Sequence, residues 1–374
     1  MKRIFVTSMS AELGGIEKSL VTFLQYLVSL PATEVTLMLW KKRGELLPSI
    51  PNEVKVVDAP TPGNLKTVMK KTSLKHLLLY MKLKYYTHKN RPWNAFPKQE
   101  GKYDIAIAYS QDGYSPYYIM DKVVATRKFM WYHHGTYLHT GTLKDIDALY
   151  YPKFTSVIPV SESIKETLIK EFPTTDIKYT VIPNLLNVDE IIAKSKQSCQ
   201  DFEISGCLKL VTVGRLSQEK GQLRALDVAK ELKEQGVTFL WLFVGGGSDK
   251  EACIQKVNDL GLTGCVRFVG VKSNPYPYIS HADIYVAPSY VEADPVTIQE
   301  AIILNKPIVA SNIPAIVKAM EVANYQGTVN FDDAHNVANH IMIVKNQNYA
   351  SNHCYKLSSR NTLVVELIKD NILL

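Results

Sequence analysis

The feature that most constrains the fold is a regular alternation of short apolar runs with helical patterns. In the first half, β-branched and aromatic runs between turn-forming residues predict strands at residues 3–7, 35–40, 54–58, 104–109, 129–132, 157–160 and 179–182. Helical spacing of apolar residues follows Gly15 and again Ser161. Alternation of this kind is typical of a parallel sheet covered by helices on both faces.

The same alternation restarts in the second half. Strands are predicted at residues 208–213, 239–244, 266–269, 284–287 and 307–310, with helices between them at 223–235, 249–260 and 296–304. A break near Pro183 and a polar segment at 194–206 separate the halves. We therefore expect two doubly wound α/β domains, residues 1–186 and 187–354. Ligands of such sheets bind beyond the carboxyl ends of the strands, which predicts a deep cleft between two lobes.

Composition excludes several other classes of protein. The 374 residues suit two to three domains, and 46% hydrophobic with 21% charged residues excludes disordered and collagen-like chains. No apolar run approaches the ~20 residues of a membrane-spanning helix, and too few apolar residues follow the first charges for a signal peptide. Five widely spaced cysteines without a Cys-x-x-Cys pair argue against a disulfide scaffold or a zinc site and fit a reducing cytoplasm.

The net charge of +7 comes from one segment. Residues 59–99 contain no Asp or Glu and nine basic residues, Lys66, Lys70, Lys71, Lys75, Lys82, Lys84, Lys89, Arg91 and Lys98. The rest of the chain is slightly acidic, which argues against a nucleic acid partner. Leu, Met and Tyr residues alternate with these lysines, so the segment suits a surface for anionic lipid headgroups. A solvated helix face packed on its own domain explains the same pattern.

Two of four candidate constellations combine a glycine-containing turn with a helix start. Gly14-Gly15 follows the first predicted strand, where glycine allows a ligand close to the backbone and a helix N-terminus offers N–H groups to an anion. The third glycine of a dinucleotide fingerprint is absent. In the second half, Arg215 ends the strand at 208–213 and Lys220 lies five residues on. Two cations near a helix start suit a diphosphate, and a surface salt-bridge pair is the alternative.

The other two constellations contain carboxylates and histidines. Glu292 lies after the strand at 284–287, and Glu300 lies eight residues later inside a helix. Carboxylates there can accept hydrogen bonds from sugar and ribose hydroxyls. Pro295 and Val296 suit a first helical turn whose N–H groups face phosphate, although simple helix capping explains them too. His133 and His134 end the strand at 129–132, where either can orient a hydroxyl or phosphate, or serve only as a structural hydrogen-bonding group.

These four constellations, in this order, resemble the retaining family-4 glycosyltransferases with the GT-B fold, which has two Rossmann-like domains. The resemblance covers nearly the whole chain, and its most specific segments are Asn274–Ile279, Ala282–Ser289, Glu292-x7-Glu300 and Lys306–Ser311. These segments, together with Lys128-x-x-Trp131-x-His133, are similar to bacterial capsule, exopolysaccharide and wall-polymer transferases. The fold also implies that a C-terminal helix at about 355–374 packs back on the first domain.

The resemblance implies a role for each matching residue. Arg215 and Lys220 would hold the donor diphosphate and stabilise the leaving group, Glu300 the ribose, and Glu292 the transferred sugar. His133 would contact the sugar or the reacting centre. Gly15, Pro295 and Val296 would lie against the donor. The implied reaction moves a sugar from a nucleotide sugar, with UDP favoured over GDP, onto a hydroxyl with retention and without metal or other cofactor.

The same resemblance implies a lipid-linked saccharide or surface-polymer acceptor, and a cytoplasmic protein bound peripherally to the inner face of the cell membrane. Lys66, Lys70, Lys71, Lys75, Lys82 and Lys84 would contact the anionic membrane surface. The chain departs from the family at Asp294, which adds a charge beside the donor sugar. A nucleotide-sugar 2-epimerase of similar fold and a non-catalytic glycan-binding or lipid-binding protein remain the competing hypotheses.

Overall fold

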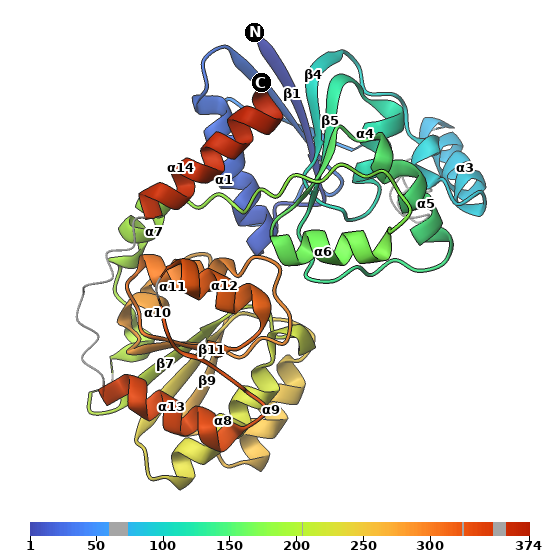
Figure 1. Ribbon diagram of the computed structural model, residues 1–374. Helices are drawn as coiled ribbons and strands as arrows, with labels where there is room; N and C mark the ends of the chain where they lie inside the picture. The colour runs from blue at the N-terminus through green and yellow to red at the C-terminus, as the bar shows by residue number, and fades with distance from the viewer. Residues whose placement is uncertain (60–73, 204, 324, 347–356) are drawn as a thin grey trace. The chain divides into compact units, whose positions relative to one another are not determined.

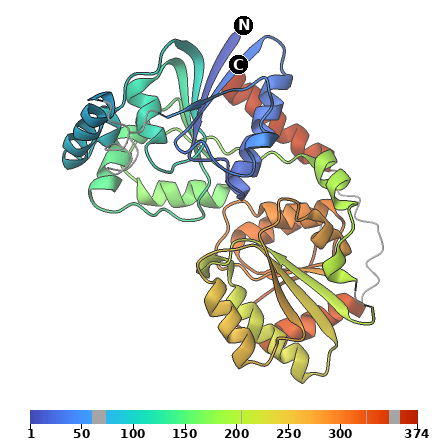
Figure 2. The same cartoon turned by 180° about the vertical axis from the view of Figure 1, so that it is seen from behind.

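The computed structural model describes residues 1–59, 74–203, 205–323, 325–346 and 357–374. The chain divides into two compact units (Figures 1 and 2). The first unit comprises Met1–Leu186 and Thr362–Leu374, and the second comprises Asn187–Asn361. Lys66, Lys70 and Lys71 lie outside the described residues. Within the described ranges, no helix combines the length and the apolar character that crossing a membrane requires.

The first unit is built on a six-stranded parallel sheet in the order β3-β2-β1-β4-β5-β6. The strands are β1 Lys2–Ser8, β2 Thr33–Leu39, β3 Lys55–Asp58, β4 Lys102–Ala108, β5 Val124–Tyr132 and β6 Ser156–Pro159. Ile4, Phe5 and Val6 on β1 are fully buried because helices cover both faces of the sheet. The strand order reverses at β1, between β2 and β4, which is where ligands of such sheets bind.

In the described part of the chain, six α-helices belong to this unit in whole or in part. They are α1 Gly15–Ser29, α3 Leu74–His88, α4 Ser115–Lys122, α5 Thr142–Tyr150, α6 Glu162–Glu171 and the C-terminal α14 Leu357–Ile368. Both views show α14 running beside α1 (Figures 1 and 2). Val364, Ile368 and Ile372 are buried, and the ammonium of Lys2 donates to the Leu373 carbonyl. These contacts fasten the end of the chain to the first unit.

The second unit has a six-stranded parallel sheet in the order β12-β11-β10-β7-β8-β9. Its strands are β7 Leu208–Val213, β8 Phe239–Val244, β9 Val266–Gly270, β10 Ile284–Ala287, β11 Ile308–Ser311 and β12 Thr328–Val329. Its helices are α7 Val188–Ser195, α8 Gln222–Glu234, α9 Lys250–Asp259, α10 Tyr276–His281, α11 Val296–Ile303, α12 Pro314–Val322 and α13 Ala334–Asn346. Helices α8, α9 and α13 cover one face of the sheet, and α10, α11 and α12 cover the other (Figure 1).

The two doubly wound parallel sheets confirm the predicted fold class. One predicted strand, residues 179–182, was wrong: only Tyr179 forms an isolated bridge, with Val157. Proline explains the missing ladder, because Pro159 at the end of β6 has no N–H to donate and Pro183 ends the opposing run. The sequence pattern also missed β12, which is two residues long, and the helices α4, α5, α7, α10, α12 and α13.

Candidate functional site

The loops that follow β7 and β8 approach each other through glycine. Gly214 donates its N–H to the Val244 carbonyl at 3.0 Å, and Leu216 donates to the Gly246 carbonyl at 2.9 Å. A Cβ atom on Gly245 would lie 1.9 Å from the Gly214 carbonyl oxygen, a distance that no side chain tolerates. The Gly245-Gly246-Gly247 run directly after β8 is the signal that sequence reasoning overlooked. It holds in place the loop that carries Arg215.

A second glycine places Lys220 against the loop that follows β10. Lys220 ends the short turn η5 (Gln218–Lys220), and Gly221 then adopts a φ of +68° before α8 begins. A Cβ on Gly221 would lie 2.0 Å from the Pro288 carbonyl oxygen. Gly221 therefore meets two demands that only glycine satisfies, a left-handed backbone and a close approach. The Tyr290 N–H donates to the Glu219 carbonyl at 2.7 Å and joins the two loops further.

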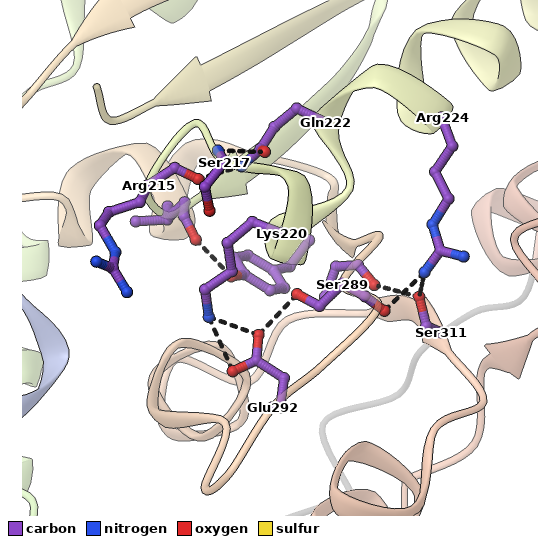
Figure 3. A network of polar contacts seen from close by, with 11 residues as sticks. Arg215, Ser217, Lys220, Gln222, Arg224, Ser289, Glu292 and Ser311 are labelled. Atoms are coloured by element: carbon purple, nitrogen blue, oxygen red, sulfur yellow. Dashed lines mark hydrogen bonds and ion pairs between the residues drawn. The ribbon is translucent and has the colours of Figure 1, made fainter. Parts of the chain in front are cut away.

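Lys220 and Glu292 meet across these loops (Figure 3). The Lys220 Nζ lies 2.7 Å from Glu292 Oε1 and 2.8 Å from Oε2. Ser289 Oγ donates to Glu292 Oε1 at 2.6 Å. The Lys220 side chain is 24% exposed and that of Glu292 is 10% exposed, so the ion pair is shielded from water but still reachable. Two residues that are 72 positions apart in the sequence thus form one polar cluster.

Arg224 fixes the loop that carries Ser289 and Glu292. Its guanidinium donates to the carbonyl oxygens of Pro288 at 2.7 Å and Ser289 at 2.6 Å, and to Ser311 Oγ at 2.9 Å (Figure 3). The same guanidinium lies 3.7 Å from the centre of the Tyr290 ring. A planar cation with several donors is well suited to hold several backbone acceptors at once. Sequence reasoning missed Arg224 because it lay inside an ordinary helical pattern.

Arg215 differs from Lys220 in that its side chain is exposed. Its carbonyl oxygen accepts a hydrogen bond from Gln222 Nε2 at 2.7 Å, and this buried glutamine also accepts from the Ser217 N–H at 3.4 Å. The guanidinium has no ion-pair partner in the part of the chain that the structure describes. In Figure 3 the side chains of Arg215 and Lys220 extend in the same general direction from their loop. The turn thus presents one paired and one unpaired cation.

The second carboxylate, Glu300, lies on α11 and is only 1% exposed. Burial raises the pKa of Tyr276 on α10, and Glu300 raises it further by its charge and by accepting a hydrogen bond from the tyrosine hydroxyl. A ribose hydroxyl reaching Glu300 would therefore meet a carboxylate that is already held in one orientation. Tyr276 was part of the resemblance but had no predicted role.

Asp294 and Pro295 shape the start of α11. The Val296 N–H donates to the Asp294 carbonyl at 2.8 Å, and the Ile298 and Gln299 N–H groups both donate to the Pro295 carbonyl at 3.1 Å. The Asp294 carboxylate accepts a hydrogen bond from the Gln299 side chain. The charge that departs from the family pattern is thus engaged with the helix that follows it. Among the described residues, no three His, Cys, Asp or Glu side chains are grouped to hold a metal ion.

His133 belongs to the first unit, in a polar cluster at the carboxyl ends of β4 and β5. Its backbone N–H donates to Gln111 Oε1 at 3.0 Å, and its ring packs on Tyr109 with 5.0 Å between ring centres. Ser19 of α1 contacts the Tyr109 hydroxyl at 2.7 Å and donates to Asn184 Oδ1 at 2.8 Å. Burial lowers the pKa of His133 to about 4, against smaller opposing effects from Tyr109, Asp112 and Asn184. The ring is therefore neutral at physiological pH.

The other predicted residues of the first unit lie close to this cluster in sequence. Gly15 is exposed at the first position of α1, and a Cβ built there has no neighbour within 4 Å among the described residues. His134 is partly exposed, and its Nε2 atom lies 3.4 Å from Asp112 Oδ1. The structure thus brings Arg215, Lys220, Glu292, Pro295, Val296 and Glu300 together on the loops and helix of the second unit, and His133 and Gly15 belong to the first.

Residues 200–360 match the family model described as "Glycosyl transferases group 1". The chain is 26% identical over 169 residues to an uncharacterized glycosyltransferase, MJ1059, of Methanocaldococcus jannaschii. The aligned region covers 44% of this chain and 41% of that protein. It is 31% identical over 122 residues to the amylovoran biosynthesis glycosyltransferase AmsK of Erwinia amylovora, with 30% of each chain covered. The chain thus matches less than half the length of these curated relatives.

The match to solved structures extends over the whole chain. The crystal structure of Anabaena Alr3699/HepE in complex with UDP and glucose superposes with a TM-score of 0.67 at 18% identity, covering 99% of this chain and 100% of that one. WaaG, a glycosyltransferase involved in lipopolysaccharide biosynthesis, superposes with a TM-score of 0.59 at 14% identity, covering 98% and 94%. The fold of this chain is therefore the GT-B fold.

The environment of His133 yields a prediction for its titration. Because burial disfavours the charged imidazolium, the side chain should bind a proton only near pH 4, well below the ~6.5 of a free histidine. We expect the His133 Hε1 resonance to stay constant from pH 8 to pH 5 in an NMR titration of selectively labelled protein. The resonance is assigned by its loss in His133→Gln. A midpoint above pH 6 would contradict the buried, neutral ring.

Proposed function

We propose that this chain, whose residues 200–360 form a domain of the glycosyl transferases group 1 family, transfers a sugar from a nucleoside diphosphate sugar to a hydroxyl group of a saccharide acceptor. The observation that carries the proposal is the cluster at the carboxyl ends of β7 and β10. Arg215 and Lys220 supply two cations there, and Glu292 places a carboxylate 2.7 Å from the lysine. Cations suit the diphosphate, and a carboxylate suits the hydroxyls of the sugar.

In this proposal the positive side chains stabilise the leaving group. The bond between the anomeric carbon and the phosphate oxygen breaks, the acceptor oxygen bonds to the same carbon, and the acceptor proton moves to the departing phosphate oxygen. Attack from the face that the diphosphate leaves retains the anomeric configuration. Arg215, Lys220 and the positive end of the α11 helix dipole meet the negative charge that develops on the diphosphate, without metal or other cofactor.

Uridine is the proposed nucleoside of the donor, and its ribose is assigned to Glu300. The base rests on Anabaena Alr3699/HepE, whose crystal structures contain UDP or UDP-glucose in the same fold. Glu300 is buried on α11, directly after the turn with Asp294 and Pro295, and the Tyr276 hydroxyl orients its carboxylate. A GDP-sugar remains the alternative donor. Of the residues in the first unit, Gly15 is assigned to the donor phosphate and His133 to the transferred sugar.

The proposed acceptor is a lipid-linked saccharide or a growing surface polymer. AmsK is named for the biosynthesis of amylovoran, and a Campylobacter jejuni relative, 23% identical over 40% of this chain, is named for transfer to a diphospho-undecaprenol-linked saccharide. An acceptor anchored in a membrane requires an enzyme that reaches the membrane surface. The basic segment of the first unit is the proposed contact, which would make the protein a cytoplasmic, peripheral membrane protein.

Helix α3 has two apolar stripes on opposite sides. Leu79, Leu83 and Tyr86 are half-buried, and α3 contacts the short turn η2 (Pro92–Ala95). The second stripe is exposed, with Leu77 at 44%, Leu78 at 50%, Met81 at 59% and Tyr85 at 59%. These four positions follow helical spacing and so form one ridge. The ridge is an apolar surface that the described part of the first unit leaves uncovered.

Lysines flank this exposed ridge on both sides. Lys82 and Lys84 are exposed, and on a helical wheel they fall on either side of the stripe formed by Leu78, Met81 and Tyr85. Both views of the fold place α3 at the periphery of the first unit (Figures 1 and 2). An apolar ridge between cations suits shallow insertion into an anionic headgroup layer, with about 1 kcal/mol contributed by each lysine near the surface.

The donor assignment predicts the effect of removing either cation. Lys220→Met and Arg215→Met should each lower turnover at least ~30-fold, about 2 kcal/mol of transition-state stabilisation. Turnover is measured as UDP released from a panel of UDP-hexoses and UDP-N-acetylhexosamines with polyprenyl-diphosphate-linked saccharides as acceptors. Lys256→Met is the matched control, because Lys256 is also partly buried in an ion pair, with Asp227 at 2.7 Å. Full turnover in both site variants would refute the assignment.

The membrane assignment predicts the effect of changing α3. Wild-type protein should cosediment with phosphatidylglycerol vesicles more than with phosphatidylcholine vesicles, and less as salt shortens the Debye length below ~10 Å. Lys82→Glu with Lys84→Glu, or Leu77→Ser with Met81→Ser, should reduce binding at least fivefold. Leu149→Ser, at a position on α5 that is 48% exposed, controls for losing an exposed leucine. Equal pelleting of all variants would show that α3 is only a solvated face.

A further inference from the structure

The ion pair between Lys220 and Glu292 occupies the cation that is assigned to the donor diphosphate. Glu292 contacts the Lys220 Nζ through both carboxylate oxygens, at 2.7 and 2.8 Å. The cation assigned to the diphosphate is therefore already neutralised by the carboxylate assigned to the sugar. Arg215 on the same turn has an exposed side chain and no such partner among the described residues. Before a ligand binds, Lys220 is therefore paired with a carboxylate, whereas Arg215 has no such partner among the described residues.

The backbone keeps this pair together. Gly221 packs against the Pro288 carbonyl, the Tyr290 N–H donates to the Glu219 carbonyl, and Arg224 holds the carbonyls of Pro288 and Ser289. The two loops are fixed to each other by these contacts. A ligand that takes Lys220 must therefore compete with Glu292 through side-chain rotation, since the loops themselves are held.

Displacing Glu292 costs free energy because its side chain is only 10% exposed. A shielded carboxylate that loses its counter-ion keeps, among the residues that the structure describes, one hydrogen-bond donor, the Ser289 Oγ. Hydroxyl groups of a sugar attached to the diphosphate can supply the missing donors. A nucleoside diphosphate without a sugar takes Lys220 and leaves Glu292 uncompensated.

We infer that Glu292 is an internal competitor for Lys220 that makes the site select the sugar-bearing nucleotide over the free nucleoside diphosphate. The inference rests on the proposed function and adds a specificity-determining role for the pair. After the sugar has left, Glu292 recovers Lys220 and the nucleoside diphosphate is bound more weakly. The same carboxylate thus recognises the substrate and favours release of the product.

Calorimetric titration with UDP tests the competition. Glu292→Gln removes the charge that neutralises Lys220 and should bind UDP at least threefold more tightly than wild type, although its glycosyl-transfer turnover should fall. Glu219→Gln is the matched control, because Glu219 is an exposed carboxylate on the same turn and its loss changes the local charge equally without freeing Lys220. Its UDP affinity should rise by less than half as much as that of Glu292→Gln.

A double-mutant cycle separates competition from general electrostatics. In a Lys220→Met background there is no lysine to release, so adding Glu292→Gln should then change UDP affinity no more than Glu219→Gln does. Glu292→Ala repeats the test if the glutamine variant is poorly folded. Equal UDP affinity in wild type and Glu292→Gln, or an equal gain in both glutamine variants, would overturn the inference alone. Wild-type protein that binds neither UDP nor GDP would overturn the proposed function together with it.

Discussion

The close approach of two loops at the carboxyl ends of β7 and β10 is the constraint on which the proposed site depends. Gly221 makes this approach possible, since any side chain there would collide with the Pro288 carbonyl 2.0 Å away. Arg224 then holds the second loop by its carbonyl oxygens. As a result Lys220 and Glu292, which come from different βα units, form a hydrogen-bonded ion pair before any ligand arrives. Position, charge and exposure of the proposed donor site all follow from this packing.

The charged side chains of the proposed site are either exposed or held by a partner. Arg215 is exposed and available, Lys220 is held by Glu292, and Glu300 is held by Tyr276. Lys220, Glu292 and Glu300, the shielded charges, each have a partner, which limits the free energy that burial of a charge would otherwise cost. A nucleotide sugar carries both the anion and the hydroxyl groups that these side chains need. The arrangement is therefore more specific than a simple basic patch would be.

The sequence predicted the fold well because the periodicity of apolar residues and the positions of turn-forming residues are local signals. The predicted strands 208–213, 239–244 and 284–287 coincide with β7, β8 and β10. The prediction of a strand at 179–182 was wrong because Pro159, in the neighbouring strand β6, has no N–H to donate to it. A local pattern does not reveal which strand will be the neighbour. The residues of the proposed site were found by motif, but the contact between Lys220 and Glu292 spans 72 positions and depends on tertiary packing. Arg224 was missed because its role lies in contacts with another loop, whereas the Gly245-Gly246-Gly247 run was a local signal that was overlooked.

The proposed donor site is tested most directly by a crystal structure of the protein with a UDP-hexose that stabilises it. In that structure Lys220 Nζ should contact a diphosphate oxygen within ~3.2 Å, and a sugar hydroxyl should donate to Glu292 in its place. Arg215 should contact the same diphosphate, and the ribose should contact Glu300. A bound nucleotide sugar that leaves the Lys220–Glu292 pair at its present 2.7 Å, with the diphosphate held elsewhere, would contradict the account.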